Sequence, residues 1–122
     1  MILGQNGFWG DLLTVSDDGV SRIREWIDAY KKVRDDITAV GATRVGDVGG
    51  SPEIYEKINP KNGRGVVVIF AAARGRYQYI TRSPVAPVYY KTDGITICKS
   101  ASNNAILEIV FKESGAQMVF FG

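Results

Sequence analysis

Carboxylates are the main candidates for catalytic chemistry in this sequence. The chain has no histidine and a single cysteine, Cys98, which excludes Ser-His and Cys-His dyads and histidine-containing zinc sites. Hydrolysis by carboxylates needs two carboxyl groups held a defined distance apart across a cleft. No spacing singles out a pair among the carboxylates beyond residue 40, which are Asp47, Glu53, Glu56, Asp93, Glu108 and Glu113. We therefore expect no catalytic residue, no metal site and no cofactor.

Two further candidates have simpler interpretations. Asp35 and Asp36 resemble an acid pair, but adjacent positions on a helix point about 100° apart. We interpret them as part of a solvated, charged helix face. Cys98 lies in a segment of alternating polarity, which favours a small packing residue over a nucleophile.

The first fifteen residues contain a glycine-rich segment with two aromatic side chains, Phe8 and Trp9. In one interpretation, it is a loop in which glycine supplies unusual backbone angles and the aromatic rings pack on a neighbour. In the other, it faces a ligand, with Trp9 as a stacking platform and Asp11 as a polar contact. Both interpretations remain open at this stage.

Tyrosines on or beside the expected strands form a third group of candidates. Exposed rings can bind the C–H face of a sugar, whereas tyrosine in a sandwich strand is usually half-buried with its hydroxyl at the rim. The second interpretation is favoured for all four residues, Tyr77, Tyr79, Tyr89 and Tyr90.

These residues would be positioned by one helix and a set of strands. Ser16 is the expected N-cap, with Asp17 and Asp18 in the first turn, where the helix dipole favours negative charge. Apolar residues then recur at helical spacing along one face: Val20, Ile23, Trp26, Ile27, Tyr30, Val33 and Ile37. The opposite face predicts i,i+4 ion pairs, namely Arg24–Asp28, Asp28–Lys32, Lys31–Asp35 and Lys32–Asp36.

After residue 40, short apolar runs alternate with turn signals, and no further helical pattern occurs. Residues 65–71 form a continuous apolar run, as expected of a strand buried on both faces, whereas residues 76–82 and 105–112 alternate. Other expected strands cover residues 44–48, 53–58, 95–99 and 116–121, whereas the prolines at 84 and 87 bracket a loop or a short edge segment at residues 88–90. The pattern predicts a mainly β protein, an antiparallel sandwich of about seven strands preceded by one amphipathic helix. We divide it into residues 1–40, the loop and helix, and residues 41–122, the sandwich.

Composition limits the expected partners. With 15 basic and 13 acidic residues, the net charge of +2 gives no electrostatic reason to expect nucleic acid or an anionic membrane. The apolar runs are too short to span a bilayer, and no basic region precedes the short apolar stretch at residues 1–3, so we expect no signal peptide in this chain. A single cysteine forms no intrachain disulfide, which leaves the compartment open.

Two stretches of the chain resemble the end of a (β/α)-barrel glycoside hydrolase of the melibiase (α-galactosidase) type. Residues 1–38 resemble the last barrel strand, its loop and the last helix of such an enzyme; their sequence is MILGQNGFWGDLLTVSDDGVSRIREWIDAYKKVRDDIT. The all-β domain after such barrels resembles residues 52–82, PEIYEKINPKNGRGVVVIFAAARGRYQYITR, and residues 115–122, GAQMVFFG.

The resemblance implies that this chain is a non-catalytic C-terminal β-sandwich segment with a structural or accessory role. The two catalytic aspartates of that family would lie upstream of Met1. Because barrel active sites lie at the C-terminal ends of the strands, the loop after the last strand could contact carbohydrate weakly through Asn6, Phe8, Trp9 and Asp11. A free-standing carbohydrate- or protein-binding module is the alternative. One strand and one helix do not form a barrel, so we expect the helix to pack on the β-domain or to support a homodimer.

Overall fold

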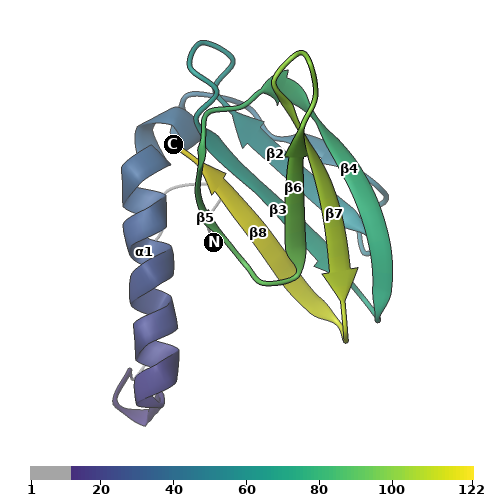
Figure 1. Cartoon of the computed structure of the whole chain (residues 1–122). Coiled ribbons are helices and arrows are strands. Elements are labelled where there is room, and N and C mark those ends of the chain that lie inside the picture. Colours follow the sequence, from purple (N-terminus) through teal and green to yellow (C-terminus); the bar gives the residue numbers. More distant parts are fainter. Residues whose placement is uncertain (1–11) are drawn as a thin grey trace.

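The computed structural model describes residues 12–122, in which a long helix is followed by eight strands in two sheets (Figure 1). A short 3-10 turn, Leu12–Thr14, precedes helix α1, Asp17–Thr38. The strands are β1 (Thr43–Val45), β2 (Glu53–Ile58), β3 (Gly65–Ala71), β4 (Gly75–Pro84), β5 (Val88–Lys91), β6 (Ile95–Lys99), β7 (Asn104–Phe111) and β8 (Gly115–Phe121). The expected mainly β sandwich preceded by one helix is confirmed, with eight strands rather than about seven.

Helix α1 begins where its sequence predicts. The Ser16 hydroxyl accepts a hydrogen bond from the Gly19 N–H at 3.2 Å, and Asp17 and Asp18 occupy the first turn. The cap satisfies one of the N–H groups that have no partner inside the helix. At the other end, the Thr38 hydroxyl donates to the carbonyl of Arg34 at 3.0 Å.

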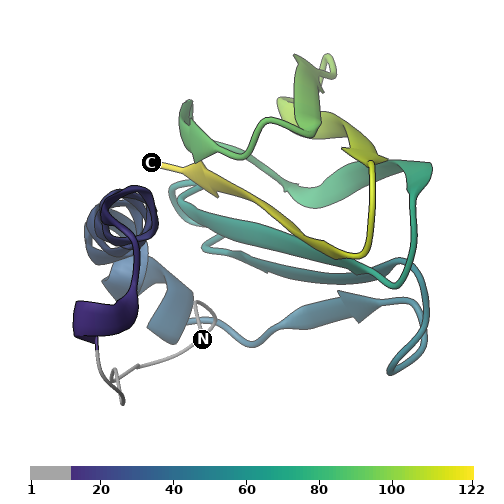
Figure 2. The same ribbon diagram turned by 90° about the horizontal axis from the view of Figure 1, so that it is seen from below.

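The strands form a five-stranded sheet in the order β1-β2-β3-β8-β5 and a three-stranded sheet in the order β4-β7-β6. All paired strands are antiparallel. The chain crosses between the sheets after β3, β4, β5 and β7. Helix α1 covers the outer face of the five-stranded sheet, and the three-stranded sheet covers its inner face (Figure 2).

The main hydrophobic core lies between the two sheets. In β7, the alternate residues Leu107, Ile109 and Phe111 are buried in this core, as the alternation of residues 105–112 predicts. Val67 and Ile69 of β3 face them from the other sheet.

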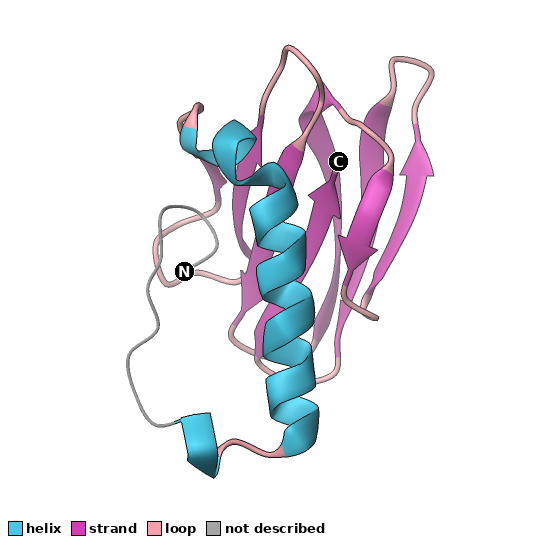
Figure 3. Cartoon of the chain, turned by 90° about the vertical axis from the view of Figure 1, so that its left-hand side faces the viewer, coloured by secondary structure: helices cyan, strands magenta, loops and turns pink. Residues whose placement is uncertain are grey.

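A second core joins α1 to the five-stranded sheet. Ala29, Val33 and Ile37, spaced four residues apart, are 1% exposed or less, and they pack on Val66 and Phe120. The alternate residues of β3 and β8 thus enter different cores, which explains why the apolar run at residues 65–71 is continuous. Figure 3 shows the helix lying across the strands. The expectation that the helix folds back on the β-domain is confirmed.

The first strand is shorter than predicted. The sequence suggested residues 44–48, but β1 ends at Val45. Gly46 has φ 91°, and an added Cβ there would lie 2.3 Å from the Pro52 carbonyl oxygen. This turn directs the chain away from the sheet, so Val48 is left 74% exposed.

Candidate functional site

The four residues expected to contact carbohydrate, Asn6, Phe8, Trp9 and Asp11, lie outside the described residues. The site is therefore built from the polar groups of residues 12–122.

Glu56 is a carboxylate buried between the two sheets, with 4% of its surface exposed. It accepts a 2.7 Å hydrogen bond from the Tyr79 hydroxyl and a 3.0 Å bond from the Arg82 N–H. The Ser83 N–H also points to it, at 3.4 Å. All three donors belong to β4, and the Arg82 and Ser83 N–H groups lie at the irregularity between Ile80 and Pro84. Burial, and then the bond to Glu56, raise the pKa of Tyr79 well above its usual range. Glu56 therefore links the two sheets.

Two other carboxylates also have local partners. The Tyr55 hydroxyl donates to Glu53, the Gly49 N–H donates at 3.1 Å, and these two bonds lower the pKa of Glu53. Glu108 accepts from Gln78 on the outer face of the three-stranded sheet. Glu56 thus lies between the two sheets, whereas Glu108 lies on the outer surface of the three-stranded sheet. Among residues 12–122, no cluster of three potential metal ligands occurs.

The tyrosines have different environments and do not form one platform. Tyr79 is buried, and Tyr77 packs on Phe111 with the ring centroids 6.1 Å apart. Tyr90 accepts a 2.9 Å hydrogen bond from the Trp26 indole N–H. Tyr89 is 48% exposed, but the Lys32 ammonium lies 3.4 Å from its ring centroid. Tyr89 is therefore half-buried, as predicted, and one face of its ring is covered by a cation.

Cys98 also differs from its prediction. It is exposed on the outer face of the three-stranded sheet, beside Ile106. In β6, Ile95 is buried and Ile97 packs against the core, so the side chains that alternate with them, Thr96 and Cys98, point outward. Cys98 is therefore a surface residue and not a packing residue.

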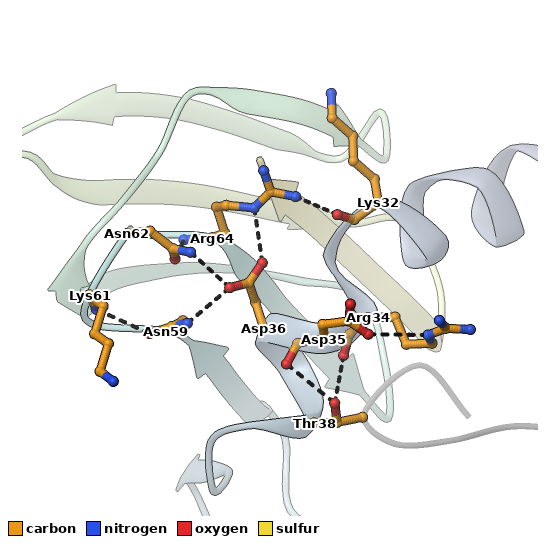
Figure 4. Close-up of polar contacts among 9 residues, drawn as sticks. All are labelled: Lys32, Arg34, Asp35, Asp36, Thr38, Asn59, Lys61, Asn62 and Arg64. Atoms are coloured by element: carbon orange, nitrogen blue, oxygen red, sulfur yellow. Dashed lines mark hydrogen bonds and ion pairs between the residues drawn. The ribbon is translucent and has the colours of Figure 1, made fainter.

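Asp36 is the centre of a polar cluster, the Asp36 cluster, that ties α1 to the β2–β3 loop (Figure 4). Its carboxylate accepts hydrogen bonds from Asn59 Nδ2 at 2.9 Å, Asn62 Nδ2 at 2.8 Å and Arg64 Nε at 2.9 Å. Arg64 also donates to the backbone carbonyl of Lys32. Only 14% of the Asp36 side-chain surface is exposed. The predicted solvated role is therefore wrong for Asp36.

Burial alone would raise the pKa of Asp36, but the bonds from Asn62, Asn59 and Arg64, together with the Arg64 charge, outweigh it and lower the pKa. Within residues 12–122, none of the four predicted i,i+4 ion pairs forms; the helix pairs are Arg22–Asp18, Arg34–Asp35 and Arg64–Asp36. For Lys32–Asp36 the structure shows the reason: Asp36 pairs with Arg64 and Lys32 lies over the Tyr89 ring, and these tertiary contacts displace a pair worth only ~0.3–0.5 kcal/mol.

A depression of about 360 Å³ lies next to the Asp36 cluster, at the end of the sandwich where three connections meet. It is lined by Pro60, Lys61, Asn62, Gly63, Pro84, Val85, Lys99 and Asn103. We call it the loop depression. Loops held at one end of a sandwich are common positions for binding sites.

Backbone hydrogen bonds hold the three connections together. The Ala86 N–H donates to the Gly63 carbonyl at 2.9 Å, and the Val85 N–H donates to the Asn103 carbonyl at 3.0 Å. Gly63 has φ 72°, and a Cβ there would lie 2.6 Å from the Ala86 nitrogen. Only glycine fits this contact without displacement of the backbone. The backbone of the depression is therefore held in place by contacts within the chain, without a ligand.

The groups available in the loop depression are donors. Within the described part of the chain, Lys61 and Lys99 have no ion-pair partner, and none of the eight lining residues is acidic. Ammonium groups and an amide can bind an anion or a hydroxyl group, but this set contains no nucleophile next to a general base. The arrangement is suited to binding.

Family models, curated proteins and solved structures show no match to this chain. The melibiase-type resemblance consequently stays a prediction. A separate property concerns the helices: none in residues 12–122 combines the length and apolar character needed to cross a membrane.

Each of the three connections contains turn-forming residues, at positions 59–63, at the prolines 84 and 87, and at positions 100–104. The sequence carried no signal that these turns meet. Glu56 could have been suspected, because it alternates with Ile54 and Ile58 and so shares their buried face.

Proposed function

We propose that this chain is a non-catalytic accessory unit, a β-sandwich with an attached helix of the kind that follows the barrel in melibiase-type glycoside hydrolases. The observation that carries the proposal is the second core. Val33 and Ile37 of α1 are buried against the same sheet whose other face closes the sandwich. A helix packed in this way can transmit the position of a neighbouring domain to the sandwich.

The N-terminal half of α1 offers the surface for such a neighbour. At 22 residues, the helix is about 33 Å long, and its first turns lie away from the strands in Figure 1. In α1, Val20 is 39% exposed and Ile23 is partly exposed, and Leu13 in the 3-10 turn before the helix is 95% exposed. These apolar side chains lie beyond the part of the helix that the sheet covers, as expected if a barrel helix or a second copy of this chain packs there.

The positions of the carboxylates also support a non-catalytic role. Glu56 links the sheets and Asp36 links the helix to a loop, with their oxygens occupied by donors of the same chain. Replacing those bonds by contacts to a substrate would leave buried donors without partners.

The alternative is a free-standing carbohydrate- or protein-binding module, and the loop depression favours it. Titration of the purified chain with neutral mono- and oligosaccharides separates the two functions. An accessory unit binds them weakly or not at all, whereas a dedicated carbohydrate module binds at least one of them saturably.

Two observations test the accessory proposal directly. The purified chain should not hydrolyse nitrophenyl glycosides, and the genome should encode a barrel upstream of Met1. Glycoside turnover that disappears on substitution of one carboxylate would refute the proposal, as would the absence of any barrel-coding sequence upstream.

A further inference from the structure

We infer that the loop depression is a binding site for an oxyanion group, a carboxylate, phosphate or sulfate, held by Lys61 and Lys99 with the Asn103 amide beside them. This site is independent of the accessory role, since a chain without any barrel partner keeps the same three connections.

The surroundings of the loop depression carry a net positive charge. Lys61 and Lys99 line the depression without a carboxylate among its walls. Asp36, the acidic residue of the neighbouring Asp36 cluster, is already neutralised by Arg64 at 2.9 Å and accepts hydrogen bonds from the Asn59 and Asn62 amides. Lys61, Lys99 and Arg64 therefore outnumber Asp36, which leaves a positive field at this end of the sandwich. An anion is the ligand that such a field attracts.

The backbone around Asn103 is preorganised. The turn that carries Asn103 is closed by the Ser100 N–H, which donates to the Asn104 carbonyl at 2.9 Å, and by the Ser102 hydroxyl, which donates to Asn104 Oδ1 at 2.8 Å. The backbone N–H and carbonyl of Asn103 are both bonded, to Ser100 and Val85. Asn103 therefore lines the depression on a backbone that is already ordered. A ligand then orders only the exposed side chains of Lys61, Lys99 and Asn103, which limits the entropic cost of binding.

The size and polarity of the loop depression suit a small anion. About 360 Å³ is near the lower end of the ~300–1,000 Å³ typical of small-molecule sites. Pro60, Pro84 and Val85 supply apolar wall but no aromatic ring. A neutral sugar would lack the stacking surface that such ligands use, whereas an oxyanion, free or carried on a small molecule such as an acidic sugar, meets charged donors.

The test is a titration of the ¹⁵N-labelled full chain followed by NMR, at constant ionic strength maintained with sodium chloride. The probes are inorganic phosphate, sulfate, galacturonate and, as the neutral counterpart, galactose. We expect saturable shifts confined to the amides of Lys61, Gly63, Val85, Lys99 and Asn103. Tighter binding of phosphate or sulfate would identify a free anion, and tighter binding of galacturonate an anion carried on a sugar.

The double variant Lys61→Gln/Lys99→Gln should lose about tenfold or more in affinity, as expected when two charge-assisted contacts are removed. Lys112→Gln is the matched control, because Lys112 is an exposed lysine beyond the opposite end of β7, and it should bind as the unaltered chain does. Both lysines are exposed, so the double variant should retain the dispersed spectrum of the fold. Shifts that do not saturate, equal binding of galactose, or unchanged affinity in the double variant would overturn the inference.

Discussion

The hydroxyl of Tyr79 donates a 2.7 Å hydrogen bond to the carboxylate of Glu56, across the interface between the two sheets. Both residues are buried, with 4% of Glu56 and 8% of Tyr79 exposed. The bond lies beside the irregularity in β4, where the N–H groups of Arg82 and Ser83 also point at the carboxylate. One buried acid thus supplies the acceptors for donors that the interrupted strand cannot pair in its own sheet.

Removing the Glu56 carboxylate should strongly destabilise the sandwich. Glu56→Ala leaves the Tyr79 hydroxyl and the Arg82 N–H without their acceptor, and each buried donor that loses its partner costs about 1–3 kcal/mol. Tyr79→Phe removes one donor and should cost less, about 1 kcal/mol. Urea unfolding measures both free energies. Tyr89→Phe is the control, since Tyr89 is half exposed; equal stability of Glu56→Ala and this control would contradict the prediction.

Side-chain truncation should reduce stability much more in the C-terminal half of α1 than in its N-terminal half. Ile37 is fully buried against the sheet, so Ile37→Ala should cost about 2–5 kcal/mol. Val20 is 39% exposed, so Val20→Ala should change stability by less than about 0.5 kcal/mol. Denaturant unfolding gives the two values, and amide exchange should show stronger protection near Val33 than near Val20. A uniformly fast-exchanging helix would contradict the packing described above.

Acid should weaken the connection between α1 and the β2–β3 loop through Asp36. Its pKa is lowered from the ordinary 3.8, so the folded state stabilises the ionised carboxylate more than the unfolded chain does. The resulting stabilisation is fully present above pH 3.8 and is lost as the pH falls through the lowered value. Unfolding at several pH values checks this.

The matched variant for that experiment is Asp36→Asn, which removes the titrating group while keeping its size. It should be less stable near neutral pH and should show a smaller loss of stability between pH 4 and pH 2 than the unaltered chain. Identical pH profiles for the two proteins would show that Asp36 does not contribute.

Two glycines with nearly the same backbone angle offer a direct test of crowding. Gly63 and Gly49 have φ of 72° and 73°. An added Cβ at Gly49 meets no atom within 4 Å, whereas at Gly63 it meets the Ala86 nitrogen at 2.6 Å. Gly49→Ala should therefore cost only the left-handed strain, about 1–2 kcal/mol. Gly63→Ala should cost more and should disturb the Ala86 amide signal. Equal losses in thermal unfolding would mean that the contact between the loops is readily relieved.

Several features of the fold follow from local patterns. The N-cap at Ser16, the alternation of β7 and the doubly buried run of β3 were all predicted, because each depends on hydrogen bonds or periodicity within a few residues. Cys98 was predicted wrongly although it too lies in an alternating strand. Periodicity shows that two faces exist, but the packing of the sheets decides which of them is covered.

The candidate site was less predictable than the fold. Asp36 was assigned to a solvated face because Lys32 stands four residues before it, at a spacing that favours an ion pair. Its actual partners, Asn59, Asn62 and Arg64, belong to a loop that is distant in sequence. Rules based on the spacing of neighbouring residues do not predict contacts between segments that far apart in the sequence.

The amino-acid sequence by itself determined the kinds of elements, their order and the two-sided burial of β3, since these depend on backbone geometry and apolar periodicity repeated along the chain. Only the tertiary structure decided that half of α1 is covered, that Glu56 joins the sheets, and that Lys61, Lys99 and Asn103 line one depression. Such relationships arise when segments far apart in the chain pack together, because it is the packed core that selects which polar groups meet and which remain available to a ligand.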